Sequence, residues 1–357
     1  MIGQKLKLAR KAAGLSLRQL QDKIGNRVTA QAIGKYERNE SVPSSPVLIA
    51  LAEALAVSVD YLLGDQDLSL DRVEFRKKSV LSRKEKARLE AKTIDRLERY
   101  LLVEELLGLQ SIEWDRPLGA PYAVTVPSEA ETVAIRTREH WGLGTDPIPD
   151  LAELAEERGI KVLSLQFEDH VDGLTADVYR PDKPPLPVIM VNARHWGERQ
   201  RFTLAHELGH ILMQPLDDKN ATERSAHRFA GAFLMPAEAL WAEIGMHRTS
   251  FGMGELVQLK KVFRVSLQAL TYRFLDLGII TRSVFKEMFG YFSQQNYRTP
   301  PYKEPGALPP DSEEPLRFQR LCFRALAEEA ISEAKCAELL GISARQLQQE
   351  MGESQSV

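Results

Sequence analysis

Residues 202–210 of this 357-residue chain are Phe202-Thr203-Leu204-Ala205-His206-Glu207-Leu208-Gly209-His210. If the segment is helical, His206 and His210 lie on one face, because residues four apart stack above one another. Both imidazoles can then reach one metal ion, with the carboxylate of Glu207 beside them. The alternative is a helix with two surface histidines. The apolar neighbours argue against it, because they predict burial, and unpaired buried histidines are costly to desolvate. The stretch therefore predicts a metal-binding helix.

A hydrolytic zinc site needs a third protein ligand and an open position for water. Asp217 and Asp218 fall in a polar turn, whereas Glu223 opens a new helical pattern. That pattern has an apolar stripe, which would pack on the first helix and aim Glu223 at the metal. The stripe consists of Ala226, Phe229, Ala230, Phe233 and Leu234. One turn beyond Glu223, His227 is either an ordinary half-buried histidine or a second-shell partner of a ligand histidine.

These two segments resemble the ImmA/IrrE family of metallopeptidases. The matching residues are Arg201–His210, Glu223-x-x-Ala226-x-x-Phe229-Ala230 and Leu234-Met235-Pro236. Members of the family are zinc peptidases that typically cut a repressor protein, so that derepression follows. The resemblance implies that His206, His210 and Glu223 bind Zn²⁺ and that Glu207 is the general base. Many members have Asn or Asp where this chain has His227.

The N-terminus carries a second, separate signal, which predicts five short helices in residues 1–65. Gly14 and Gly25 end the first two helices, and Ser16 and Thr29 cap the second and third. The region resembles the Xre/lambda-repressor class of helix-turn-helix domains, with the closest match at Gln31-Ala32-Ile33-Gly34-Lys35-Tyr36-Glu37-Arg38. By this resemblance, residues 29–35 lie on the recognition helix.

The chemistry of this region fits double-stranded DNA. Gln31 can make a bidentate contact with adenine, and other side chains can reach phosphates or base edges. The expected contact residues are Thr29, Ala30, Gln31, Gly34, Lys35, Arg38 and Asn39. Net charge is +3 over residues 1–65, +6 over 72–100 and −10 over 101–357, so positive charge gathers at this end. The alternatives are a solvated charged face or a protein-interaction module.

The chain is expected to be α+β and predominantly helical, with six parts. After the helix-turn-helix domain (1–65), residues 66–112 form a basic, helical connector dominated by an amphipathic helix from Ser82 to Leu109. Packing of this helix on the following domain is favoured. The alternative is a dimerisation helix, which a homodimer on paired half-sites would need.

Residues 113–250 predict a zincin-like peptidase domain with a small sheet. Helices near 129–141 and 149–158 precede strand-like runs at 161–167, 174–179 and 188–191, and a strand edge could hold an extended substrate. Residues 251–299 contain another helix-turn-helix-like pattern, which is more often a packing hairpin than a DNA reader. The Pro-rich residues 300–315 predict a stiff, extended linker. Residues 316–357 predict a helical unit of open role, with docking as one option.

Composition limits the class of protein. The chain is 43% hydrophobic, which suffices for a core in each domain, and it has no apolar run long enough to span a membrane. Its first residues do not resemble a signal peptide, so a cytoplasmic location is expected. The two cysteines, Cys322 and Cys336, are expected to be small buried side chains, neither ligands nor a disulfide.

Two functions fit these observations. In the first, a DNA-binding regulator with a zinc endopeptidase domain cleaves itself or a companion repressor. In the second, the chain is a repressor, such as the antitoxin of a toxin–antitoxin, stress-response or phage-response operon, and its peptidase-like domain binds the partner without cleavage. Glu207 favours hydrolysis, because a purely structural metal site needs no base beside its ligands.

Overall fold

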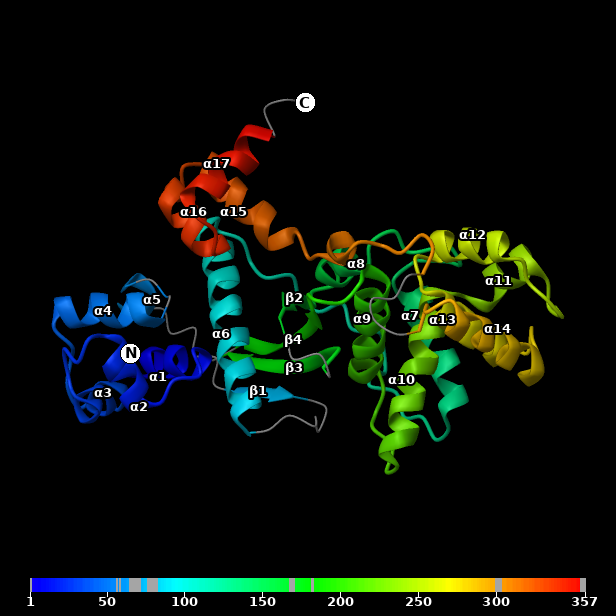
Figure 1. Cartoon of the computed structure of the whole chain (residues 1–357), viewed down its shortest axis with the longest axis horizontal. Helices are drawn as coiled ribbons and strands as arrows, with labels where there is room; N and C mark the ends of the chain where they lie inside the picture. The colour runs from blue at the N-terminus through cyan, green and yellow to red at the C-terminus, as the bar shows by residue number, and fades with distance from the viewer. Residues whose placement is uncertain are drawn as a thin grey trace.

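The computed structural model describes residues 2–55, 57, 59–63, 72–75, 83–166, 171–180, 183–298 and 304–353. Helices predominate among these residues, and four strands form one sheet (Figure 1). The predicted fold class, α+β and mainly helical, is therefore confirmed.

The N-terminal helices form a bundle with its own core. They are α1 (Ile2–Ala12), α2 (Leu17–Lys23), α3 (Ala30–Glu37), α4 (Ser45–Leu55) and α5 (Val59–Leu63). The predicted caps are present: the Ser16 side chain accepts a hydrogen bond from the backbone N–H of Gln19, and that of Thr29 accepts one from Ala32. Leu20, Ile33 and other apolar residues are fully buried between the helices.

A long helix, α6 (Arg83–Leu106), connects the N-terminal bundle to the rest of the chain. Its apolar residues Leu97 and Leu101 pack in one cluster with residues of the sheet, and Leu8 of α1 joins the same cluster. Tyr100 and Val103 pack instead in a cluster with the C-terminal helices. The apolar side of α6 is thus used for packing within the chain, as the connector interpretation predicts.

The sheet has the strand order β1-β3-β4-β2. Its strands are β1 (Arg72–Phe75), β2 (Lys161–Leu165), β3 (Gly173–Arg180) and β4 (Lys183–Asn192). β3 and β4 are antiparallel, β2 runs parallel to β4, and β1 runs antiparallel to β3. Three strands match the predicted runs, and β1 is a further strand, within residues 66–112, that the sequence did not predict. A four-residue strand is stable here because it pairs with the outer side of β3.

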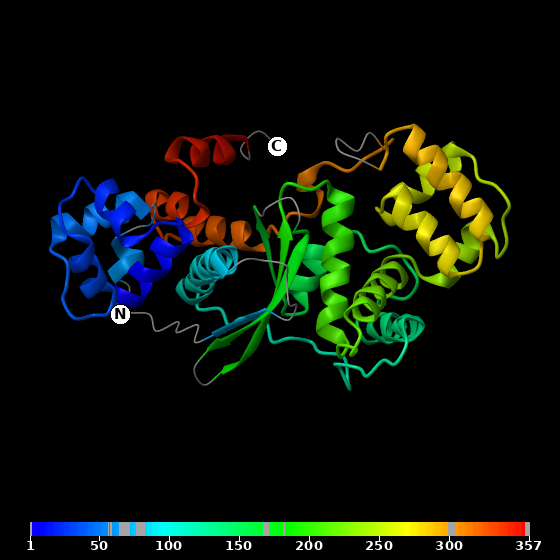
Figure 2. The same cartoon turned by 60° about the horizontal axis from the view of Figure 1, so that its bottom comes forward.

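α6 lies on one face of the sheet and α9 (Gly197–Leu212) on the other (Figure 2). Around α9 lie the other helices of this region, which are η1 (Pro127–Glu129), α7 (Ala130–His140), α8 (Leu151–Glu157) and α10 (Lys219–Leu234). Their apolar sides, together with β2 and β4, form the largest core of the molecule. α9 is buried along nearly its whole length, as its apolar sequence predicts.

Four further helices follow: α11 (Ala237–Ile244), α12 (Met253–Phe263), α13 (Leu267–Asp276) and α14 (Arg282–Gln294). The expected helix-turn-helix-like pattern is the pair α12–α13. Leu270, Thr271 and Phe274 of α13 are fully buried, and α13 packs against α10. This burial supports the packing-hairpin interpretation and argues against a second DNA reader at this position.

The segment 300–315 is expected from its sequence to be a stiff, extended linker, and its described residues, 304–315, are bound to neighbouring helices. Glu304 accepts hydrogen bonds from Lys260 (2.6 Å) and from the backbone N–H of Leu267 (2.7 Å). Glu313, in the short helix η2 (Pro310–Glu313), forms a fully buried ion pair with Arg201 of α9 at 2.7 Å. The described part of the segment contains a turn at 305–306 and the helix η2, and its two buried carboxylates bind it to α9, α12 and α13.

The chain ends in α15 (Arg317–Ala327), α16 (Glu333–Leu340) and α17 (Ala344–Glu353), which pack on α6. Cys322 and Cys336 are both buried and free, as predicted. Among the helices formed by described residues, none combines the length and the apolar character needed to cross a membrane.

Candidate metal centre

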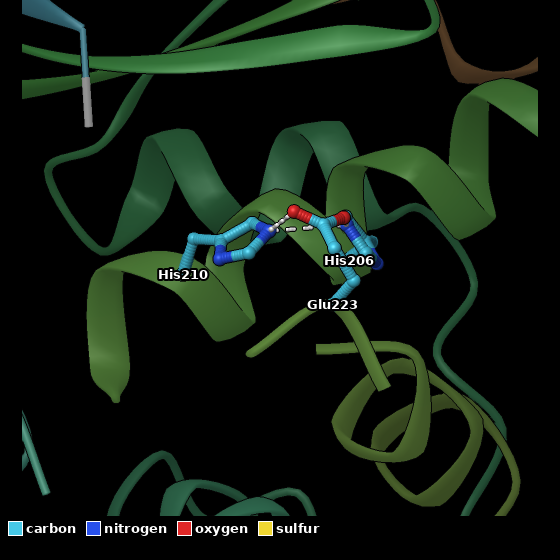
Figure 3. A group of neighbouring side chains, drawn as sticks. All are labelled: His206, His210 and Glu223. Atoms are coloured by element: carbon cyan, nitrogen blue, oxygen red, sulfur yellow. Dashed lines mark hydrogen bonds and ion pairs between the residues drawn. The ribbon is translucent and has the colours of Figure 1, made fainter. Parts of the chain in front are cut away.

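His206 and His210 lie one turn apart on α9, with their side chains directed to the same point (Figure 3). Their Nε2 atoms are 3.1 Å apart. His206 is buried, with 6% of its surface exposed, and His210 is half-buried. At this distance the two nitrogens can share a hydrogen bond, or both can bind one cation.

The third candidate ligand, Glu223, projects from the first turns of α10 toward the two histidines (Figure 3). Its carboxylate oxygens lie 3.4 Å from Nε2 of His206 and 3.8 Å from Nε2 of His210. The close packing of α9 and α10 makes this possible: a Cβ atom at Gly209 would stand 3.0 Å from the ring of Phe229. The glycine of the motif thus lets the second helix bring its carboxylate to the histidines.

This donor set fits a divalent zinc ion. Candidate ligand atoms of His206, His210 and Glu223 all lie within 4.8 Å of one another. Two imidazoles and one carboxylate form a known ligand set of catalytic zinc, and such a set leaves a position open for water. The structure therefore brings together all three residues that the sequence proposes as ligands.

Glu207 is adjacent to His206 on α9 and is almost fully buried, with 2% of its surface exposed. It nevertheless lines a cavity of about 1030 Å³, together with His206, Glu223 and His227. The cavity extends from the candidate ligands to α13 and to the segment after residue 304. Because a carboxylate beside the ligands faces this space, it is placed to exchange a proton with water or with a bound molecule.

Ion pairs stiffen two walls of the cavity. On one wall, Asp172 binds His195 (3.0 Å) and Arg199 (2.6 Å). Burial raises the pKa of Asp172, but the hydrogen bond from His195 and the charge of Arg199 outweigh burial, and the pKa falls below its usual value. Both side chains therefore favour a charged Asp172 at the rim.

On the other wall, Glu131 of α7 accepts hydrogen bonds from Arg273 of α13 (2.7 Å) and Arg228 of α10 (2.9 Å). Arg228 also lies 3.1 Å from Asp276. Burial raises the pKa of Asp276, although the charge of Arg228 opposes the rise. The network fixes three helices to one another around the cavity, so α13 contributes to the site through a rigid attachment.

His227 lies beside the candidate ligands, but it is exposed and faces the cavity. Its ring centre is 4.4 Å from that of His206 and 5.9 Å from that of Phe202. The two imidazole rings are tilted by 51° relative to each other. The second-shell hydrogen bond expected from the sequence stays a prediction.

In the N-terminal bundle, the expected recognition helix is α3. Gln31 and Lys35 are exposed on it, and Thr29 caps its N-terminus. Gln21 of α2 accepts a hydrogen bond from the backbone N–H of Ala30 at 2.7 Å, which ties the start of α3 to the preceding helix. This arrangement leaves one polar side of α3 free to face a ligand.

Comparison with protein families matches residues 155–275 to the IrrE N-terminal-like domain and residues 6–62 to a helix-turn-helix domain. The chain joins a helix-turn-helix domain to an IrrE-like domain. Both resemblances seen in the sequence are thereby confirmed. The IrrE-like match includes α9 and α10, with all candidate ligands, and continues through α12 and most of α13, which line part of the cavity.

Two curated relatives resemble the helix-turn-helix domain. One is the uncharacterized HTH-type transcriptional regulator YobD of Bacillus subtilis (strain 168), 39% identical over 74 residues, which are 21% of this chain and 64% of that protein. The other is the SPbeta prophage-derived uncharacterized HTH-type transcriptional regulator YonR of the same strain, 38% identical over 63 residues, 18% of this chain and 56% of that protein. The chain thus spans less than two thirds of either relative.

The remaining DNA-contact candidates of the helix-turn-helix domain have structural contacts of their own. Gly34 is buried, with a Cβ position 3.6 Å from Leu17, and Asn39 accepts a hydrogen bond from the backbone N–H of Gly3 at 2.9 Å. Arg38 pairs with Glu40 at 2.6 Å on the surface. Gln31 and Lys35 therefore stay the stronger predictions for base and phosphate contacts.

The sequence did not indicate several residues that line the cavity of the IrrE-like domain. Asp172 and Gly173 come from the start of β3, and Tyr272 and Arg273 come from α13, about 65 residues after the metal motif. The sequence signals near them are the strand-like run at 174–179 and the helix-turn-helix-like pattern, and neither singles out these residues. Their role becomes visible only when β3, α9 and α13 are seen together.

Proposed function

We propose that the chain is a DNA-binding transcriptional regulator whose IrrE-like domain is a zinc-dependent endopeptidase. The peptidase part rests on the convergence of His206, His210 and Glu223, of which His206 and Glu223 line the cavity together with Glu207. The DNA-binding part is supported by the helix-turn-helix match and by relatives named as transcriptional regulators. Exposed Gln31 and Lys35 on α3 supply donors for bases and phosphates of an operator.

The chemistry assigned to the IrrE-like domain is peptide-bond hydrolysis. His206, His210 and Glu223 would hold Zn²⁺, which when bound supplies Lewis-acid activation of water and of a peptide carbonyl. Glu207 would accept a proton from the attacking water and then deliver it to the leaving amine. Its position favours this role, because Glu207 lies next to His206 on α9 and lines the cavity, within reach of a water in that space.

The substrate class is an extended segment of a protein. Among the described residues, β1 pairs with β3 from Ala176 to Tyr179, and the start of β3 lies beyond this pairing, where Gly173 and Leu174 line the cavity. An extended peptide could add to this strand and so lie alongside Glu207. A repressor protein, or a segment of this chain itself, is the substrate that we propose.

The peptidase proposal is tested with Glu207→Gln, which keeps the size of the side chain and removes the base. The purified chain, and separately the total protein of the source cells, is incubated with wild type or variant, and new protein N-termini are identified by mass spectrometry. Exposed Glu243 on α11 provides the control variant Glu243→Gln. We expect new N-termini with wild type and control and none with Glu207→Gln, although all three bind zinc equally. If Glu207→Gln gave the same new N-termini as wild type, Glu207 would not catalyse the cleavage. The remaining function of the domain would then be to bind a partner without cleaving it.

The DNA part is tested with Gln31→Ala combined with Lys35→Ala. Each good base contact contributes about 1–3 kcal/mol, so we expect at least a tenfold loss of affinity for the operator. The operator is first selected from a random-sequence duplex library with the wild-type chain. Unchanged affinity of the double variant would show that α3 does not read DNA.

A further inference from the structure

The three C-terminal helices form a second helical bundle that is separate from the metal centre. Their core is a cluster that includes Leu321, Cys322, Ala325, Cys336 and Leu347. α15 packs on α16, and α16 packs on α17. A three-helix bundle whose last two helices are joined by a short turn is the arrangement of a helix-turn-helix unit.

The turn between α16 and α17 has a fixed geometry. Gly341 adopts φ +74°, and its backbone N–H closes the end of α16. Ser343 begins α17: its Oγ accepts from the backbone N–H of Gln346 (3.2 Å), and the Gln346 side chain accepts from the backbone N–H of Ser343 (2.9 Å). Reciprocal capping sets the direction in which α17 leaves the turn.

A turn with the same sequence pattern occurs in the N-terminal helix-turn-helix domain. Gly14-Leu15-Ser16-Leu17-Arg18-Gln19-Leu20-Gln21 and Gly341-Ile342-Ser343-Ala344-Arg345-Gln346-Leu347-Gln348 share six identical positions. Gly14 also has positive φ, Ser16 and Gln19 also cap each other, and Leu20, like Leu347, is fully buried. In that domain the turn joins α1 to α2, the helix before the expected recognition helix α3, so the likeness concerns the geometry of the turn and not the DNA-reading position.

The outward side of α17 carries polar side chains suited to DNA. Arg345, Gln348 and Gln349 are exposed, whereas Leu347 faces the core. Glu350 is turned toward α15, where it accepts a hydrogen bond from Gln319 at 3.2 Å. Arginine and glutamine make the bidentate contacts that distinguish guanine and adenine in the major groove. The exposed face of α3, with Gln31 and Lys35, has the same kind of chemistry.

The pair α12–α13 has a similar helix-turn-helix pattern, but it differs from α16–α17 in how far its second helix is exposed. The second helix of this pair, α13, is covered by other elements. Its residues Leu267, Thr271 and Arg273 are buried, and the helix packs on α10. Among the described residues, no comparable cover lies over Arg345, Gln348 and Gln349, which are all exposed. Of these two described pairs, α16–α17 is the one whose second helix presents polar side chains to solvent.

Both the N-terminal and the C-terminal bundle pack on α6. Arg99 of α6 donates a hydrogen bond to the carbonyl of Glu338 at 2.8 Å, and Tyr100 stacks on Phe318 with ring centres 5.4 Å apart. α1 of the N-terminal domain packs on the same helix. Figures 1 and 2 both show the two bundles at the end of the molecule away from α10. One rigid element thus fixes the distance between α3 and α17.

We propose that α17 is a second DNA-reading helix, so that each chain contacts duplex DNA at two places and recognises an operator of two elements. α17 would enter a major groove with Arg345, Gln348 and Gln349 at the base edges. Arg320 and Arg324 of α15 are half-exposed in surface ion pairs with Glu153 and Glu328. Such pairs contribute little to stability, so these arginines can exchange them for phosphates.

The test uses the full chain with Arg345, Gln348 and Gln349 all changed to Ala. A matched control removes the same side chains from an exposed helix elsewhere, with Arg282, Gln294 and Gln295 changed to Ala at the two ends of α14. Circular dichroism and thermal unfolding first establish that both variants are folded. Each is then compared with wild type on duplexes that wild type selects from a random-sequence library.

We expect wild type and control to protect two separate segments of the selected duplex from hydroxyl-radical cleavage. The α17 variant should protect one segment and bind about tenfold more weakly or worse. Gln31→Ala with Lys35→Ala should weaken protection of the other segment. Protection of two segments by the α17 variant, with affinity equal to that of the control, would overturn the proposal.

Two further outcomes separate this inference from the proposed function. If wild type protects a single segment, which depends on Gln31 and Lys35 alone, the second reader is wrong and the first stands. If the α17 variant binds DNA as wild type does but changes the molar mass in light scattering, α17 is a contact between copies of the chain, and the inference is again wrong. Failure of wild type to select any sequence would count against both DNA sites.

Discussion

The backbone of Gly173 in β3 lies directly against the side chain of Glu207 in α9. A Cβ atom at position 173 would stand 3.3 Å from Cγ of Glu207 and only 2.4 Å from Cγ2 of Thr203. It would also lie 2.8 Å from the carbonyl oxygen of Met190 in β4. Only glycine allows the strand and the helix to approach this closely. Gly173 therefore sets the distance between the sheet and the proposed general base.

Replacing Gly173 by Val should move β3 away from α9 and destabilise the protein. Overpacking of this kind costs about 1–3 kcal/mol, which urea unfolding measures as a lower midpoint. Gly254→Ala in α12 is the control, because a Cβ atom there meets nothing within 4 Å. Equal midpoints for Gly173→Val and the control would show that the strand and the helix adapt without cost.

Removal of His227 should leave zinc binding intact, whereas removal of His210 should abolish it. His227 contacts the ring of His206 but lies outside the group of converging ligand atoms. We expect about one zinc per chain in His227→Ala and far less in His210→Ala, because two ligands hold the ion poorly. Atomic emission after gel filtration measures the content. A zinc-free His227→Ala protein would make His227 a ligand.

Glu98 makes the stability of the protein depend on pH. It lies in α6 with 9% of its surface exposed, and its Oε2 has no hydrogen-bond partner among the described residues. Burial raises the pKa of Glu98 to about 7. The carboxyl is therefore neutral in both folded and unfolded states below pH about 4.5. As pH rises to about 7, only the unfolded state ionises readily, so the free energy of unfolding falls.

Glu98→Gln should remove this dependence. At pH 8 the variant should be more stable than wild type by about 2 kcal/mol, and near pH 4.5 the two should be equal. Denaturant unfolding between these pH values measures the difference. Glu105→Gln, at an exposed position of the same helix, controls for the loss of a surface charge. A constant difference between Glu98→Gln and wild type across the range would disprove the raised pKa.

The ion pair between Arg201 and Glu313 should be essential for stability, because both side chains are fully buried. Glu313→Ala leaves the guanidinium buried without its partner, which costs about 3–5 kcal/mol. The neighbouring, exposed Glu314 gives the control Glu314→Ala. Thermal unfolding should show a large drop for the first variant and little change for the second. In the double variant Arg201→Met with Glu313→Leu, most of the stability should return, since no charge is left buried.

Much of the candidate site could be predicted from the sequence, because its geometry is local. The spacing of His206 and His210 specifies one helix face, and the apolar stripe after Glu223 predicts a packed second helix. Ser16 and Thr29 locate the starts of α2 and α3 for the same reason. Caps and helical periodicity depend on residues a few positions apart, so they can be recognised in a single sequence.

The tertiary structure decided what depends on partners far apart in the chain. β1 is a strand because β3 offers it an edge, and residues 304–315 are held against the helices because Lys260 and Arg201 bind Glu304 and Glu313. The cavity likewise combines β3, α9, α10 and α13. Sequence patterns carry hydrophobicity and turn chemistry, but they do not say which distant strand or charge a segment meets. That choice is made by the packing of the whole chain.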